Sequence, residues 1–104
     1  MEIVSKVYDV SALIPSDERF GIRSQATRAA VSIPANIAEG SAKRSNKEYV
    51  RFVEIAQGSA FELETHLLII EKRKWVENKV IEELVEMVRR EQKMIDGFLD
   101  KLGE

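Results

Sequence analysis

The chain has no cysteine among its 104 residues. This absence excludes disulfide bonds and thiolate metal sites, and it suits a reducing compartment, so we expect a cytoplasmic protein. No stretch reaches the length of about 18 apolar residues that a membrane span requires. The first residues mix acids into their apolar positions, unlike a secretory signal peptide. We therefore expect no membrane partner.

Residue types that support catalysis are also scarce. His66 is the single histidine, and a ferritin-like di-iron site would need a glutamate three residues before it, where Leu63 stands. The sequence has no glycine-rich phosphate loop and no base suited to a serine nucleophile. A structural role for His66 is the favoured interpretation. We expect no catalytic residues, no bound metal and no cofactor, and so a protein that is not an enzyme.

One enzymatic alternative rests on three glutamates, Glu82, Glu83 and Glu86. Their spacing resembles the magnesium-binding pattern of all-α nucleoside triphosphate pyrophosphatases, which also place an E-x-x-D motif on a following helix. Here Asp96 and Asp100 belong to the same predicted helix as the glutamates. Carboxylates from one helix would leave much of the octahedral shell of magnesium empty, so we favour a solvated helix face.

Apolar residues recur with helical periodicity along the whole chain, and strand-like alternation is absent. Pro15 should end the first helix, and Ser16 is available to cap the next. The periodicity predicts helices over residues 2–14, from Asp17 or Phe20 to Glu39, over about 26–28 residues after Ser45, and over 79–102. Short connections between long helices favour antiparallel neighbours. We predict an all-α fold, an up-down antiparallel four-helix bundle, with residues 1–104 as a single domain.

Pro34 lies inside the second predicted helix. Its ring removes one hydrogen bond to the Ala30 carbonyl, at a cost of about 3 kcal/mol in a helix interior. The helix either kinks at Pro34 or breaks at Ser32 and restarts. We favour the kink because Ile33 and Ile37 remain in phase across the proline.

The junction between the second and third helices has strong boundary signals. Gly40 is expected to adopt a left-handed conformation after the helix end. Glu39 lies at the negative end of the helix dipole, so we expect it to pair with Arg28, Lys43 or Arg44. Ser45 and Glu48 have the spacing of a capping box that begins the third helix.

Charge is distributed unevenly although the net charge is only −2. Residues 19–51 hold seven bases and two acids, a local charge of +5, between segments of −3 and −4. We take six of the bases as a candidate nucleic-acid-binding group: Arg23, Arg28, Lys43, Arg44, Lys47 and Arg51.

The placement of these cations limits the choice of partner. Cations at a helix N-terminus oppose the helix dipole, so helix stability does not explain them. Binding to the phosphate backbone of a nucleic acid would explain their placement. We expect Tyr49 and Phe52 to be buried, which favours phosphate contacts over base stacking. An acidic protein, or neutralisation by neighbouring helices, would explain the same charges.

The third predicted helix has more apolar residues than one buried stripe requires. Its main stripe includes Tyr49, Val53, Ala56, Ala60, Leu63, Leu67 and Ile70. Off this stripe lie Val50, Phe52, Ile55, Phe61, Leu68 and Ile69. Part of this helix is therefore expected either to contact another subunit or to be covered by the bundle itself.

Three segments together resemble a known family: ERFG at 18–21, SQATRAAVSIPANIAEGSAKRSNKEYVRF at 24–52, and the spaced residues from Ala56 to Leu67. They are similar to the four-helix-bundle proteins encoded in intervening sequences of bacterial large-subunit ribosomal RNA genes. The accessory variability proteins of diversity-generating retroelements share this fold. Family-motif positions here are Arg28, Pro34, Asn36, Glu39 and Gly40, and the basic stretch follows with Lys43, Arg44, Lys47 and Arg51.

The resemblance implies a bundle that assembles into a ring or barrel, commonly a pentamer, with a nucleic-acid or reverse-transcriptase partner in the retroelement branch. This chain departs from the family at its N-terminus, where members usually begin with a longer amphipathic segment containing tryptophan. Our main hypothesis is a homo-oligomer that associates with structured RNA or with a nucleic-acid-handling protein. The alternative is a protein-interaction scaffold that binds no nucleic acid.

Overall fold

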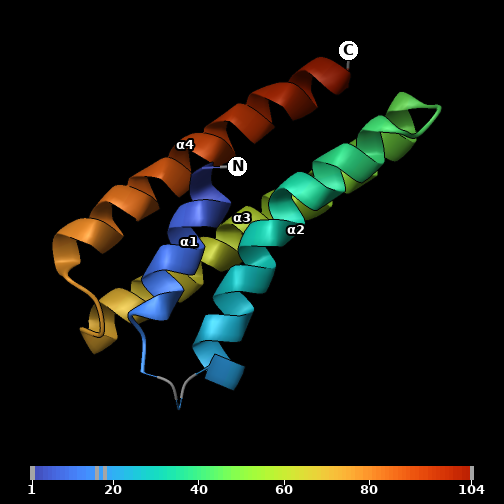
Figure 1. The fold of residues 1–104 in the computed structure, drawn as a ribbon. Coiled ribbons are helices and arrows are strands. Elements are labelled where there is room, and N and C mark those ends of the chain that lie inside the picture. Colours follow the sequence, from blue (N-terminus) through green and yellow to red (C-terminus); the bar gives the residue numbers. More distant parts are fainter. Residues whose placement is uncertain (1, 16, 18, 104) are drawn as a thin grey trace.

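The computed structural model describes residues 2–15, 17 and 19–103. Its helices are α1 (Glu2–Ala12), α2 (Ser24–Ser41), α3 (Asn46–Arg73) and α4 (Asn78–Leu102), with a short π-helical segment η2 (Arg19–Arg23) before α2. Consecutive helices run in opposite directions (Figure 1). The α1–α2 and α3–α4 connections lie at one end, while the α2–α3 turn and the end of α4 lie at the other. The predicted all-α, up-down four-helix bundle is confirmed.

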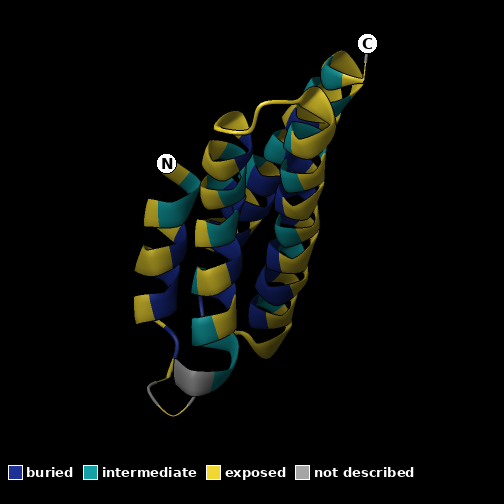
Figure 2. Cartoon of the chain, turned by 90° about the vertical axis from the view of Figure 1, so that its right-hand side faces the viewer, coloured by how far each residue is buried: buried dark blue, intermediate teal, exposed yellow. Residues whose placement is uncertain are grey.

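The core lies between the helices, whose inward faces form the buried strips in Figure 2. The stripe predicted for α3 is buried at Val53, Ala56, Ala60, Leu63, Leu67 and Ile70. Tyr49 at its end is half-buried. Burial of each leucine contributes about 2 kcal/mol. α2 contributes small residues such as Ala26 and Ala30 to the core, both fully buried, and it packs most extensively against α3.

Near the connection between α1 and α2, two observed helix boundaries differ from the predicted ones. α1 ends at Ala12, two residues before the predicted end, and Pro15 follows. α2 begins at Ser24, later than predicted, because Gly21 adopts a non-helical conformation with φ −99° and ψ −110°. The predicted cap Ser16, and Glu18 of the family motif, lie outside the described residues.

Pro34 lies in the interior of α2, as predicted, and the helix is assigned without interruption from Ser24 to Ser41. The alternative of a break at Ser32 is therefore wrong. Close to the proline, the Asn36 amide donates hydrogen bonds to the Ser32 carbonyl (2.8 Å) and to Ser32 Oγ (2.9 Å). Ser32 Oγ in turn lies 2.8 Å from Ser59 Oγ of α3. These hydrogen bonds among Ser32, Asn36 and Ser59 connect the proline-containing turn to α3.

Gly40 has a different role from the predicted one. No described glycine has a positive φ, and Gly40 is buried inside the last turn of α2. A Cβ atom there would lie only 2.8 Å from both Phe52 Cβ and Tyr49 Cδ1. Glycine is therefore required by the close approach of α2 and α3, and not by a left-handed backbone. The left-handed helix end is instead at Lys74, with φ 60°, after α3.

α3 begins as the capping pattern predicts. Ser45 Oγ accepts a hydrogen bond from the Glu48 N–H at 3.2 Å. Among the described hydrogen bonds, the reciprocal one from the Glu48 carboxylate is absent, so half of the capping box forms. α3 has 28 residues, within the predicted length, and α4 begins at Asn78, one residue before its predicted start. None of the described helices is long and apolar enough to cross a membrane.

Candidate nucleic-acid interface

Four of the six candidate cations surround the α2–α3 turn. Lys43 and Arg44 lie in the turn, Lys47 is the second residue of α3, and Arg51 lies one helical turn further on. All four are exposed, and in the described structure no carboxylate oxygen lies within 4.0 Å of their nitrogens. We call these four residues the basic turn. It forms one tip of the bundle (Figure 1).

Local packing holds this turn in place. The Lys43 N–H donates to the Gly40 carbonyl at 3.0 Å, and Lys43 Nζ lies 5.0 Å from the centre of the Phe52 ring. This cation–π contact fixes one of the four charges beside the helix junction. The positive end of the α3 dipole lies at the same tip, so the basic turn offers both cations and backbone N–H groups to an anion.

The expectation that Tyr49 and Phe52 are buried is only partly correct. Both are half-buried. The Tyr49 ring packs edge-on against Phe98 of α4, with ring centres 5.4 Å apart and an interplanar angle of 80°. Because the Tyr49 ring packs against Phe98 and Lys43 Nζ lies over the Phe52 ring, neither ring forms a free stacking platform beside the four cations. This geometry suits phosphate contacts better than contacts to unstacked bases.

The structure does not bring Arg23 and Arg28 to this tip. Arg28 is exposed on α2, twelve residues before Gly40, which corresponds to about 18 Å along the helix. Arg23 lies still further away and lines a hollow with Tyr8 and Ser11 of α1. The predicted single group of six cations is therefore wrong in its geometry, because residues on one helix separate by about 1.5 Å per position.

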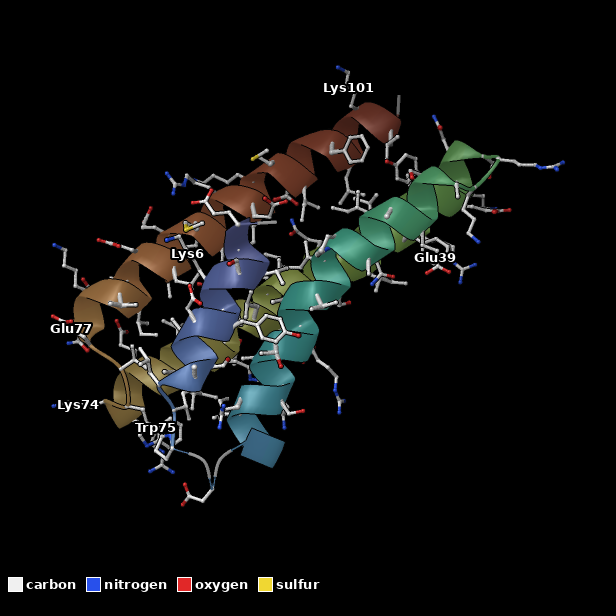
Figure 3. All side chains as sticks on the ribbon, viewed as in Figure 1. Lys6, Glu39, Lys74, Trp75, Glu77 and Lys101 are labelled. Carbon is white, nitrogen blue, oxygen red and sulfur yellow. The ribbon has the colours of Figure 1, made fainter. Side chains whose placement is uncertain are left out.

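Glu39 also lacks its expected partner. Its side chain is exposed on α2 (Figure 3). Among the described residues, no ion pair within 4.0 Å joins it to Arg28, Lys43 or Arg44. The helix end is stabilised by backbone contacts instead, with the Ala42 N–H donating to the Glu39 carbonyl at 3.2 Å.

Comparison with known proteins gives the same picture of the fold. The family model described as "23S rRNA-intervening sequence protein" matches residues 1–97. The chain belongs to this family. A crystal structure of a protein of unknown function from the S23 ribosomal protein family of Bacteroides thetaiotaomicron is similar, with a TM-score of 0.87 and 19% identity. The match covers 94% of this chain and 92% of that one. No curated protein matches the chain.

The three glutamates of the enzymatic alternative do not line one common hollow. Glu82 lines a hollow beside Leu68 and Glu71 of α3, and Glu83 lines another that faces α1. Glu86 lies between them and lines both hollows. In the part of the chain that the structure describes, no three His, Cys, Asp or Glu side chains are grouped closely enough to hold a metal ion.

His66 is buried in the bundle, as its position among apolar residues suggests. Its Nε2 lies 3.3 Å from Glu62 Oε1, one helical turn earlier. Its Nδ1 is buried and has no hydrogen-bond partner in the described structure. The pair comes from a single helix, and no nucleophile or further base is placed beside it by the described contacts.

A polar ladder between α3 and α4 was missed by reading the sequence. Gln57 Nε2 donates to the Gln92 carbonyl (2.9 Å) and to Asp96 Oδ1 (2.6 Å). Gln92 Nε2 donates to Glu64 Oε1 at 2.8 Å, and Arg89 Nε donates to Glu64 Oε2 at 2.9 Å. The hydrogen bond from Gln92, with that from Arg89, lowers the pKa of Glu64 below its ordinary value of 4.5.

The ladder left only a weak signal in the sequence. Gln57 and Gln92 are uncharged polar residues in helices whose other residues are mainly apolar or charged. Both are buried. Amide side chains can bridge helices or face solvent with equal ease, so their pairing depends on the α3–α4 register. That register is a property of the packed bundle.

Proposed function

We propose that this protein is a cytoplasmic, non-enzymatic homo-oligomer that binds structured RNA through the basic turn. The observation that supports the proposal most is the concentration of four exposed cations at one tip of an acidic protein, where no described carboxylate pairs with them. Membership of a family described by its link to 23S rRNA intervening sequences supports RNA as the anionic partner.

The form of the surface favours a duplex or other structured RNA. Phosphates along a folded RNA present several negative charges to one convex tip, and each neutralised phosphate releases counterions. The lack of a free aromatic platform argues against recognition of single strands by stacking. Arg23 and Arg28 lie too far along α2 to contact the same short stretch of backbone.

Fluorescence anisotropy with a labelled RNA hairpin of defined sequence, measured across a salt series, tests this function. We expect affinity to fall steeply with salt. Replacing Lys43, Arg44, Lys47 and Arg51 with alanine should lower affinity at least ten-fold and reduce the log–log salt slope by about 3, if each cation neutralises one phosphate.

A matched control replaces four other exposed cations with alanine: Lys79, Arg90, Lys93 and Lys101. Net charge then changes by the same amount, but binding should change little. Thermal unfolding of both variants checks the fold, since Lys43 also contacts Phe52. Equal losses in the two variants, or binding that is insensitive to salt, would refute RNA binding at the basic turn.

The oligomer part of the proposal rests on the outer face of α3. Ile55, Phe61 and Ile69 there are 50%, 52% and 42% exposed, an apolar exposure that a second subunit would cover. We propose a ring of the pentameric kind that the resemblance implies. Light scattering coupled to size exclusion should give one discrete oligomer, and Ile55→Glu with Ile69→Glu should dissociate it.

Leu13→Glu is the control, because Leu13 is even more exposed, at 60%, but lies beyond the end of α1 and away from α3. A monomer at micromolar concentration would contradict the oligomer. A discrete oligomer that binds no RNA would instead favour the alternative function, a protein-interaction scaffold.

A further inference from the structure

α1 covers only part of the bundle face formed by α2 and α4. Glu2, at the start of α1, lines the same hollows as Arg90 of α4. α4 continues to Leu102, about 18 Å further. Figure 1 shows α4 running well past the start of α1. Met94 in this stretch is 68% exposed, more than any other large apolar residue that the structure describes.

An apolar hollow of about 290 Å³ lies where α1 begins. Its apolar lining comes from three helices: Ile3, Val4, Ile33, Pro34, Met87 and Met94. Two methionines in one groove are notable because their flexible, polarizable side chains adapt to different apolar surfaces. The hollow is large enough for one or two aliphatic side chains and is continuous with the exposed side of α4.

Acidic side chains outnumber basic ones around this groove. A second hollow of about 550 Å³ shares Glu2, Met87 and Arg90 with the first and follows the seam between α1 and α4. Lys6 lies in this seam (Figure 3). The two hollows together contain five carboxylates and two cations, a net charge of −3: Glu2, Asp9, Glu83, Glu86 and Glu91 against Lys6 and Arg90. Among the described residues, none of these carboxylates has a cation within 4.0 Å.

We infer that this acidic groove, defined by the two hollows, binds a basic amphipathic helix of a partner protein. An apolar stripe at i, i+3, i+4 and i+7 would fill the methionine-lined hollow, and lysine or arginine on its flanks would meet the unpaired carboxylates. The sign of the charge excludes a nucleic acid on this face. The groove and the basic turn would then hold two different partners on separate surfaces of one bundle.

A designed peptide probes the groove directly. The probe is an 18-residue fluorescein-labelled helix with leucine on one face and lysine on the other. We expect saturable binding that weakens with salt. Two control peptides have the same leucine pattern with glutamate in place of lysine, or the same composition in a scrambled order. Both controls should bind at least ten-fold more weakly.

Protein variants locate the binding site. Glu83→Lys with Glu86→Lys should weaken peptide binding at least ten-fold, whereas the matched reversal Glu54→Lys with Asp100→Lys, outside the groove, should change it less than two-fold. Met94→Gln should weaken binding about three-fold, and Phe61→Gln on the outer face of α3 should not. All of these residues are exposed, so the fold should persist, which circular dichroism checks.

Three results would overturn the inference. The scrambled peptide could bind as well as the amphipathic one, or the two charge reversals could act equally, which would indicate attraction by net charge alone. The third is that Met94→Gln dissociates a homo-oligomer of the protein while the peptide fails to bind, which would assign the groove to a second copy of this chain.

Discussion

Substitution of Gly40 by alanine tests whether close helix packing explains the glycine in the family motif. An added Cβ would lie 2.8 Å from Phe52 Cβ and from Tyr49 Cδ1, and 3.3 Å from Tyr49 Cε1. Carbon atoms in contact normally lie about 3.5–4.0 Å apart. The Tyr49 ring can rotate, but Phe52 Cβ is fixed to the backbone, so α2 and α3 must separate locally.

Two effects of opposite sign determine the result. Alanine is favoured over glycine in a helix interior by about 1 kcal/mol, whereas overpacking a well-packed site costs about 1–3 kcal/mol. Because the clash involves a backbone-linked atom, we expect the packing cost to prevail. Gly40→Ala should lower the free energy of unfolding by about 1–2 kcal/mol, or lower the melting temperature by roughly 5–10 °C for a chain of this size.

Gly58→Ala and Gly97→Ala provide matched controls in α3 and α4. Apart from the adjoining residues and backbone of the same helix, no atom lies within 4 Å of a Cβ built at either position, so each variant should gain about 0.5–1 kcal/mol from helix propensity alone. Urea unfolding followed by circular dichroism measures all three. If Gly40→Ala is stabilised as much as the controls, then close packing is not the reason for this glycine.

Three further predictions concern single contacts. Lys74→Gly should raise the free energy of unfolding by about 0.5–1 kcal/mol, because Lys74 has φ 60°, and Lys74→Ala should give no such gain in the same urea titration. Ser45→Ala should cost about 1 kcal/mol by removing the cap of α3, while Ser45→Asp should largely retain it. Folding lowers the pKa of Glu64, so the ionised carboxylate stabilises the folded protein above pH 4.5. This contribution is lost as pH falls through the pKa of the folded state. Wild type should therefore lose more stability than Glu64→Gln between pH 6 and 3, and equal losses would contradict the role of the ladder.

The sequence predicted best what depends on neighbours along one helix. The buried stripe of α3 from Val53 to Ile70 follows from a 4-3 repeat, and the Ser45 cap follows from local spacing. Gly40 shows where local reasoning fails. A glycine near a helix end is consistent both with a left-handed backbone and with a close contact, and only the position of Phe52 across the helix pair distinguishes them.

In the candidate site, too, the sequence predicts what is close along the chain and not what depends on how the helices pack. Lys43, Arg44 and Lys47 are close in sequence and remain close in the fold. Arg23 belongs to the same basic segment of the sequence, but the length of α2 places it near the opposite end of the bundle, beside Tyr8 and Ser11. The polar ladder at Gln57 could not be predicted, because it depends on the axial register of α3 against α4.

The motif residues and the basic turn are physically linked at one helix junction. Asn36 holds the proline-containing turn to α3 through Ser32 and Ser59, and Gly40 allows the two helices to approach closely. The chain then reverses direction within the few residues from Ala42 to Ser45, and in the described structure the cations of this short turn have no carboxylate oxygen within 4.0 Å. Lys43 and Arg44, the charged residues of this turn, are both exposed. The packing residues therefore determine where the cations are presented, and a substitution such as Gly40→Ala should disturb RNA binding only to the extent that it disturbs this junction.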